Sequence, residues 1–502
     1  MQPSSVPFGR PWLKIAFPFL TILFAIVFYN RASLPAISVT VSIAPLSETY
    51  KLILEHAANW NTWVYTSPFS SSESPVRASG KGWNLLHGIH KAGQNTEAWS
   101  IAPPQGCYVD QVHLMSRHAE RYPKKSAGTG HLEFLERVKN TGHPLNGSLA
   151  FMNNWTYFTN DPSRDFGQLT HTGPHPGTLE AVSSGAQYRS RYGHLISRKP
   201  TRVWASGSQR VIDTARYFAS GLFGPDWESS GKAELQIIPE TFERRGDTLT
   251  PSKTCHKYLE DKARHDHGAN MLARFQSVYI RKIANRLIGE GNSGLGVLTN
   301  YEVFAMQEMC GSETMVRGSS PWCDVFTEQD WDSYEYARDL RQFYRAGPGN
   351  SYARAMGSLW LDATTELLGD GPEVGTLFLS FAHSGDIARL LTALGTFDGE
   401  PHLPTTHIVR DRTWRTSLVM PMGARITFER LSCSSTDAKA YVRVNINDRI
   451  VPLPSCRSGP GESCPLEEFV DYVHQRKEEV GDFGEVCDLD GEAGNITFLH
   501  HD

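Results

Sequence analysis

The pattern of hydrophobic and polar residues divides the chain into strand-like and helix-like segments. The run from Tyr108 to Met115 is β-branched and apolar with little helical periodicity, which predicts a buried strand. Further apolar runs predict strands at 202–205, 234–240 and 375–382. Apolar residues at helical intervals predict helices at 131–140, 178–195 and 387–394. We expect the strand at 108–115 to be central in an α/β sheet.

Outside these segments the pattern changes. Residues 250–345 are helical and polar, with continuous helical runs at 259–287 and 330–344. Segment 424–502 alternates apolar and polar positions, as antiparallel strands do. Residues 47–106 are rich in Ser, Trp, Asn and Gly, and predict an irregular N-terminal arm that packs on the main body.

The N-terminal region carries a targeting segment. Arg10 and Lys14 precede an uncharged run at 15–29, which is long for the core of a signal peptide and short for a membrane span of roughly 20 residues. We expect an uncleaved signal-anchor with residues 1–14 in the cytoplasm, because the positive charges precede the run. A cleaved signal peptide is the alternative. Either one places the chain beyond about residue 45 in the secretory lumen or outside the cell, in the first case held by a membrane anchor.

Cysteines and sequons agree with a secretory location. The eight cysteines are an even number and show no Cys-x-x-Cys metal spacing. Three Asn-x-Ser/Thr sequons predict N-glycosylation at Asn146, Asn154 and Asn495. The net charge of −5, with both signs interspersed, gives no support to a nucleic-acid partner. Attraction for an anionic substrate would therefore need a local cluster of arginines.

The strongest candidate for chemistry follows the strand at 108–115. The strand runs into Arg117 and His118, and Arg121 comes shortly after. Two guanidiniums beside one imidazole are poor core material, because each buried charge costs several kcal/mol unless it is paired. They suit a phosphate group, whose oxygens accept bidentate hydrogen bonds from arginine. Ligands of α/β sheets bind at the carboxyl ends of central strands, so we expect a phosphate to bind here.

Two later stretches offer similar groups. Arg210 lies in the first turn of a predicted helix, which one of the preceding serines, Ser206 or Ser208, is expected to cap. The N-terminus of a helix favours anions and disfavours cations, so an arginine there has little structural reason unless a phosphate binds beside it. His383 comes directly after the apolar strand at 375–382. These residues join the candidates for an anion site.

The segment Ser116–Pro123 resembles the signature Arg-His-Gly-x-Arg-x-Pro of the histidine acid phosphatases, in particular the fungal acid phosphatases and phytases. The segments that contain Arg210 and His383 are similar to two further motifs of this family, in the same order along the chain. The resemblance implies that His118 is the nucleophile and forms a phosphohistidine. It also implies that four side chains bind the phosphate: Arg117, Arg121, Arg210 and His383.

The same resemblance implies the architecture. The expected fold is α/β, a phosphoglycerate-mutase-like mixed sheet flanked by helices, with an inserted and mainly helical lobe. The catalytic domain would comprise residues 107–245 and 346–502, and the helical lobe residues 246–345. The family pattern pairs the cysteines as Cys107–Cys433, Cys255–Cys487, Cys310–Cys323 and Cys456–Cys464. No metal or other cofactor is expected, and the substrate would be a small phosphorylated molecule, with phytate as a candidate.

Two residues depart from the family pattern. Ala119 replaces the signature Gly, which costs about 1 kcal/mol of strain if that position needs a positive φ. In the family, an Asp follows the His and protonates the leaving oxygen. Here Ser384 stands in place of that Asp. A serine hydroxyl is too weak an acid for that role, and losing a general acid costs roughly 100- to 10,000-fold. We therefore expect activity on aryl phosphates, whose leaving groups need little protonation, and a sharp loss on alkyl and inositol phosphates.

Three interpretations of the missing acid remain open. Asp386 could replace it, although its other role is to cap the helix expected to begin at Ile387. Glu120, or an acid from the helical lobe, could serve instead. In the third interpretation the protein is a catalytically impaired pseudo-phosphatase that binds phosphorylated ligands. We predict an acid phosphatase, with this binding protein as the alternative.

Overall fold

The computed structural model describes residues 101–434, 439–489 and 494–500. The expected targeting segments at 1–14 and 15–29, and nearly all of the arm at 47–106, lie outside these ranges. In the part of the chain that the structure describes, no helix is both long and apolar enough to span a membrane.

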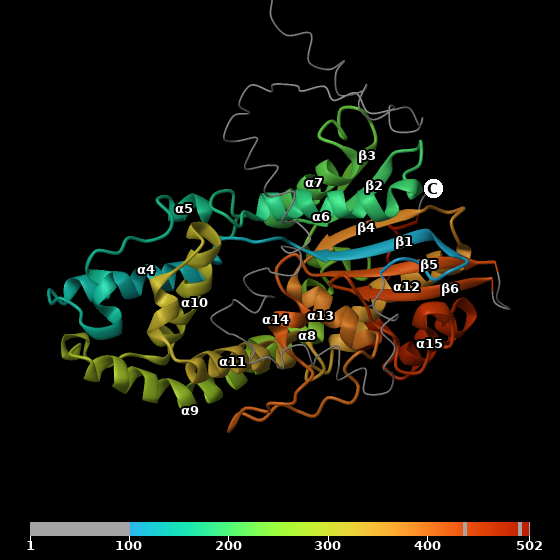
Figure 1. The fold of residues 1–502 in the computed structure, drawn as a ribbon. Helices are drawn as coiled ribbons and strands as arrows, with labels where there is room; N and C mark the ends of the chain where they lie inside the picture. The colour runs from blue at the N-terminus through green and yellow to red at the C-terminus, as the bar shows by residue number, and fades with distance from the viewer. Residues whose placement is uncertain (1–100, 435–438, 490–493, 501–502) are drawn as a thin grey trace, which may run out of the picture. The chain divides into compact units, whose positions relative to one another are not determined.

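A mixed sheet of eight strands forms the centre of the fold, in the order β3-β2-β4-β1-β5-β6-β7, with β8 paired to β6 (Figure 1). Four neighbouring strands are parallel: β1 (Cys107–Arg117), β2 (Thr201–Ser206), β3 (Ala233–Ile238) and β4 (Leu377–Ala382). The others pair antiparallel: β5 (Arg425–Cys433), β6 (Ala440–Ile446), β7 (Arg449–Ile450) and β8 (Cys464–Pro465). The expected mixed sheet is confirmed. The antiparallel strands expected in the C-terminal segment form one side of it, next to β1.

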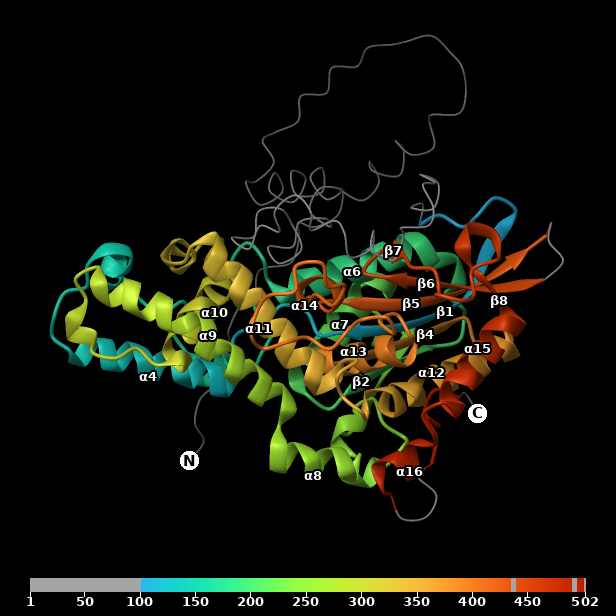
Figure 2. The same cartoon turned by 90° about the horizontal axis from the view of Figure 1, so that it is seen from below.

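Helices cover both faces of this sheet (Figures 1 and 2). On one face, α6 (Gly177–Tyr192) and α7 (Gln209–Phe223) bury Tyr188 and Phe218 against Val203 of β2. On the other face lie α12 (Ala353–Asp370), α13 (Ser384–Ala393) and α15 (Leu466–Glu478), whose apolar side chains join the same core as Trp204 and Phe378. The central strand β4 is buried along its whole length and is apolar except for Ser380, because both of its faces are covered.

A group of long helices extends from one end of the sheet (Figures 1 and 2). It contains α4 (Lys125–Asn140), α9 (His267–Gly289), α10 (Asn300–Arg317) and α11 (Glu328–Ala346). Capping boxes begin two of these helices: Thr299 and Glu302 at α10, and Thr327 and Asp330 at α11. The remaining helices are short: α5 (Pro162–Asp165), α8 (His256–His265), α14 (Thr416–Val419) and α16 (Phe483–Cys487).

The structure forms all four expected disulfides: Cys107–Cys433, Cys255–Cys487, Cys310–Cys323 and Cys456–Cys464. The first joins residues that already face each other in the β1–β5 ladder. The second joins the start of α8 to α16, across a separation of 232 residues. These two disulfides therefore fasten the sheet and α8 to the C-terminal part of the chain.

Candidate active site

The carboxyl ends of three parallel strands bring the predicted site residues together. β4 lies between β2 and β1, so the segments that follow these strands are neighbours. The backbone N–H of His118, just after β1, donates to the carbonyl of Ala382 at the end of β4. The rings of His118 and His383 lie edge to face, with centroids 6.0 Å apart. Arg210 lies beside them, with a guanidinium nitrogen 3.3 Å from Nδ1 of His383.

The ring of His118 is held in one tautomer. His118 is buried, with 2 % of its surface exposed, and its Nδ1 lies 2.9 Å from the carbonyl oxygen of Ala119. A carbonyl oxygen only accepts, so Nδ1 carries the hydrogen and a neutral ring keeps its lone pair on Nε2. Burial, together with the charges of Arg117, Arg121 and Arg210, lowers the pKa of His118 well below its usual value. The ring therefore stays neutral, with an unprotonated Nε2, at lower pH than a free imidazole does.

Three arginines surround this imidazole without carboxylate partners. Within the described residues, Arg117, Arg121 and Arg210 form no ion pair, and each has a buried Nε with no acceptor. Burial and mutual repulsion lower the pKa of Arg117 and of Arg121 to about 9, and burial also lowers that of Arg210. Uncompensated buried cations are costly, and an anion with several oxygens would satisfy all three.

Ala119 fits its position without strain. It does not belong to the described residues with positive φ, and it is buried against Leu169 and Ala181. Its backbone N–H donates to the hydroxyl of Thr214. Because φ is not positive at this position, alanine is not strained here, and the replacement of the signature glycine leaves the turn intact.

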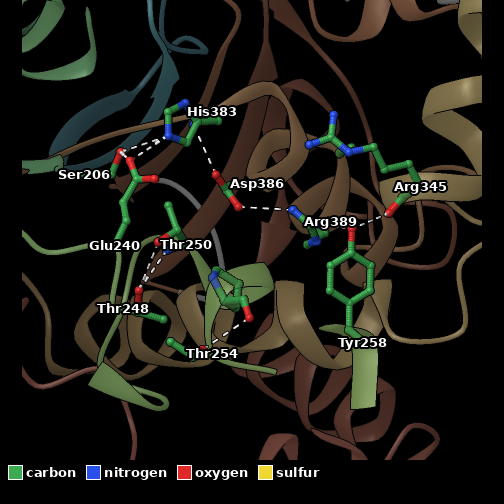
Figure 3. Close-up of polar contacts among 12 residues, drawn as sticks. Ser206, Glu240, Thr248, Thr250, Thr254, Tyr258, Arg345, His383, Asp386 and Arg389 are labelled. Carbon is green, nitrogen blue, oxygen red and sulfur yellow. Dashed lines mark hydrogen bonds and ion pairs between the residues drawn. The ribbon is translucent and has the colours of Figure 1, made fainter. Parts of the chain in front are cut away.

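The carboxylate of Asp386 is used by the helix that contains it. α13 begins at Ser384, so the expected start at Ile387 is wrong by one turn. One oxygen of Asp386 accepts from the backbone N–H of His383 at 3.1 Å, and the other lies 3.2 Å from the buried guanidinium of Arg389 (Figure 3). A side chain in the first turn binds the free N–H groups there, which supports a structural role for Asp386.

Glu120 is a buried acid of a different kind. Burial and the neighbouring Glu180 raise its pKa to about 8, and one of its oxygens has no hydrogen-bond partner. The other charges acting on it come from Arg117 and from Arg425, which pairs with Glu180. Glu120 is therefore protonated at neutral pH, next to a structural ion-pair network.

Glu240 lies in the site although the sequence pattern marked it only as the end of a strand. It follows β3, the neighbour of β2, and its Oε1 lies 2.8 Å from Nε2 of His383 (Figure 3). The same oxygen accepts from the hydroxyls of Ser206 and Ser208. Ser208 is the N-cap residue of α7, yet its hydroxyl does not cap the helix, so the expected serine cap is wrong. The only signal in the sequence was a carboxylate at the end of a predicted strand, because the sequence pattern does not contain the order of the strands in the sheet.

Positive charge continues from the three arginines onto α11. Arg338, Arg341 and Arg345 recur at helical spacing on that helix, and Arg338 also pairs with Glu308. The charge of Arg338 helps to lower the pKa of the arginines beside His118. Burial and the nearby arginines lower the pKa of Lys124 to about 6. The positive field around the site therefore extends beyond the three arginines and favours anions.

In the described ranges, no group of three or more His, Cys, Asp or Glu residues is placed to hold a metal ion. The site combines an unprotonated imidazole nitrogen with a cluster of guanidiniums.

Comparison with known proteins agrees with this arrangement. The phytase PHO112 of Candida albicans is 35% identical over 441 residues, which cover 86% of this chain and 93% of that protein. The constitutive acid phosphatase of Saccharomyces cerevisiae is 32% identical, over 79% of this chain and 83% of its own. The crystal structure of the phytase from D. castellii superposes with a TM-score of 0.74 at 30% identity, covering 83% of this chain and 91% of that one. The sequence profile of the histidine phosphatase superfamily (branch 2) matches residues 108–447. The chain therefore belongs to branch 2 of the histidine phosphatase superfamily.

Proposed function

We propose that this protein is an acid phosphatase that hydrolyses phosphate monoesters through a phosphohistidine on His118. The observation that carries the proposal is a neutral imidazole with a free Nε2, beside three partly buried guanidiniums that lack carboxylate partners among the described residues. Guanidiniums remain charged in acid, so the phosphate site would work at low pH.

In this mechanism Arg117, Arg121, Arg210 and His383 bind the phosphoryl oxygens. Nε2 of His118 attacks phosphorus while the bond to the leaving oxygen breaks, and the leaving oxygen takes up a proton. Water then attacks the phosphohistidine and releases inorganic phosphate. The arginines neutralise the charge on the equatorial oxygens in both steps.

The substrate would be a small phosphorylated molecule. Relatives named phytase and acid phosphatase support this range. The three arginines of α11 support a substrate with more than one phosphate, so phytate remains a candidate. The alternative is a pseudo-phosphatase that binds phosphorylated ligands. One observation favours it: Ser384 has no acidic group, and the carboxylate of Asp386 is bound to its own helix.

Location in the secretory lumen or outside the cell is part of the proposal. Four disulfides are typical of proteins in an oxidising compartment. The asparagines of all three sequons, Asn146, Asn154 and Asn495, are exposed, as glycosylation requires. Anchoring through residues 15–29 stays a prediction from the sequence.

Trapping the intermediate tests the proposal. Wild type and the variants His118→Ala and His256→Ala would be mixed with radiolabelled p-nitrophenyl phosphate and denatured in alkali, which preserves phosphohistidine. We expect label and turnover in wild type and in His256→Ala, whose side chain is 46% exposed and lies beside Glu260 and Asp488. His118→Ala should show neither. Retention of label or of turnover within tenfold of wild type in His118→Ala would refute the assignment.

A further inference from the structure

His383 contacts one carboxylate with its ring, and that carboxylate belongs to Glu240. Oε1 of Glu240 lies 2.8 Å from Nε2 of His383 in the described structure (Figure 3). Asp386 also lies close, but its hydrogen bond is to the backbone of His383 and not to the ring. Their side chains are partly accessible, 19% for His383 and 17% for Glu240, so both border the site rather than the core.

The surrounding hydrogen bonds determine which atoms carry hydrogen. Oε1 of Glu240 accepts from the hydroxyl of Ser206 at 3.0 Å, and from the hydroxyl and backbone N–H of Ser208 at 2.8 and 3.1 Å. An oxygen that accepts these bonds is a carboxylate oxygen, so Nε2 of His383 donates to it. The other ring nitrogen, Nδ1, faces Arg210 at 3.3 Å, on the side of the phosphate-binding arginines.

Electrostatics around His383 keep Glu240 ionised. Burial raises the pKa of Glu240, but its hydrogen bonds with His383, Ser208 and Ser206 outweigh burial and hold the pKa at about 2. The other charged or titratable groups near the ring are Arg210 from α7, Asp386 from α13 and His118 after β1. Glu240 is thus a fixed anion that is hydrogen-bonded to the His383 ring.

We propose that His383, supported by Glu240, delivers the proton to the leaving oxygen in place of the carboxyl that Ser384 lacks. The inference rests on the proposed phosphatase function. When a phosphoryl group binds, Arg210 donates its hydrogen bond to a phosphoryl oxygen instead of to Nδ1 of His383. Nδ1 is then free to carry a hydrogen, which the negative charge of the phosphoryl group favours, while Nε2–H still donates to Glu240. His383 is then the catalytic acid, and Glu240 is a positioning residue that acts through it.

The two half-reactions balance through this one ring. In the first, the P–O bond to the leaving group breaks, a bond from phosphorus to Nε2 of His118 forms, and the Nδ1 proton of His383 moves to the leaving oxygen. In the second, water attacks phosphorus and gives one proton to Nδ1 of His383. The P–N bond breaks, phosphate leaves with the remaining hydroxyl, and His383 is again an imidazolium.

Substrates with different leaving groups test this inference. Glu240→Gln keeps the size of the side chain and removes its charge. We expect turnover of glycerol 2-phosphate to fall by about 100-fold or more, and turnover of p-nitrophenyl phosphate by less than about tenfold, because the aryl leaving group needs little protonation. The matched control is Glu243→Gln, since Glu243 is exposed close by in the chain and should leave both rates unchanged.

A rescue variant separates this role from a structural one. Adding Ser384→Asp to Glu240→Gln should raise the turnover of glycerol 2-phosphate at least tenfold above that of Glu240→Gln alone. Equal losses on both substrates, or no rescue by Ser384→Asp, would overturn the pairing of His383 with Glu240. If this inference fails, phosphohistidine trapped in Glu240→Gln with the aryl substrate would still support the phosphatase assignment.

Discussion

The cluster of unpaired arginines predicts a variant that is inactive but more stable than wild type. Arg121→Met keeps most of the apolar stem of the side chain and removes one of three like charges that lie beside His118. The other two, Arg117 and Arg210, contribute to the low pKa of Arg121, and no carboxylate of the described residues pairs with any of the three. Removing Arg121 should therefore relieve repulsion in the folded state.

The size of the effect follows from the pKa. Burial and the neighbouring arginines lower the pKa of Arg121 from 12.5 to about 9, which corresponds to roughly 5 kcal/mol against the charged form. Arg121 is partly accessible, so solvent screening reduces the gain to about 1–2 kcal/mol. The folded pKa is depressed, so the penalty is fully present below about pH 9, which includes the acid range. Loss of a group that binds the transition state should lower kcat by about 100- to 1,000-fold.

Thermal unfolding at pH 5 with and without 50 mM phosphate measures both effects. We expect Arg121→Met to melt a few degrees above wild type in phosphate-free buffer and to gain less stability from added phosphate. The matched control is Arg425→Met, because Arg425 is buried but pairs with Asp448 at 2.7 Å. Its loss removes a cation from Glu180 and one of two from Asp448, which keeps Arg191, and should cost about 3 kcal/mol. A drop in melting temperature for Arg121→Met as large as that of Arg425→Met would refute the view that the cluster is uncompensated.

Two further variants test the surroundings of His118. The pKa of Glu120 is about 8 in the folded protein, above its unfolded value. The contribution of Glu120 to folding stability is therefore fully present below about pH 4.5 and is lost as the pH rises to about 8. Glu120→Gln should therefore raise the melting temperature more at pH 8 than at pH 4.5, and equal shifts at both would contradict the raised pKa. Ala119→Gly should lower stability by about 0.5–1 kcal/mol in urea unfolding without raising kcat, because Ala119 has no positive φ to relieve. A more active or more stable glycine variant would show that the turn is strained.

Local patterns were sufficient to predict most elements of the fold. The apolar runs that end at Arg117 and Ala382 are strands, and the helical intervals after residue 177 form α6. Element ends were less well predicted: α13 begins a turn early, because Asp386 binds the N–H of His383 and so lengthens the helix. A hydrogen bond of that kind depends on side-chain direction, which periodicity does not contain.

The sequence by itself marked His118, the three arginines and His383 as candidates for a phosphate site. Each of them lies next to a strand or a helix start that its own neighbours in the chain predict. Only the tertiary structure decided that Glu240 meets His383 across 143 residues. That contact requires β3, β2 and β4 to lie side by side in parallel, and strand order is set by the packing of the whole sheet. The tautomer of His118 and the burial that lowers its pKa likewise arise from packing, since burial belongs to no single segment of the chain.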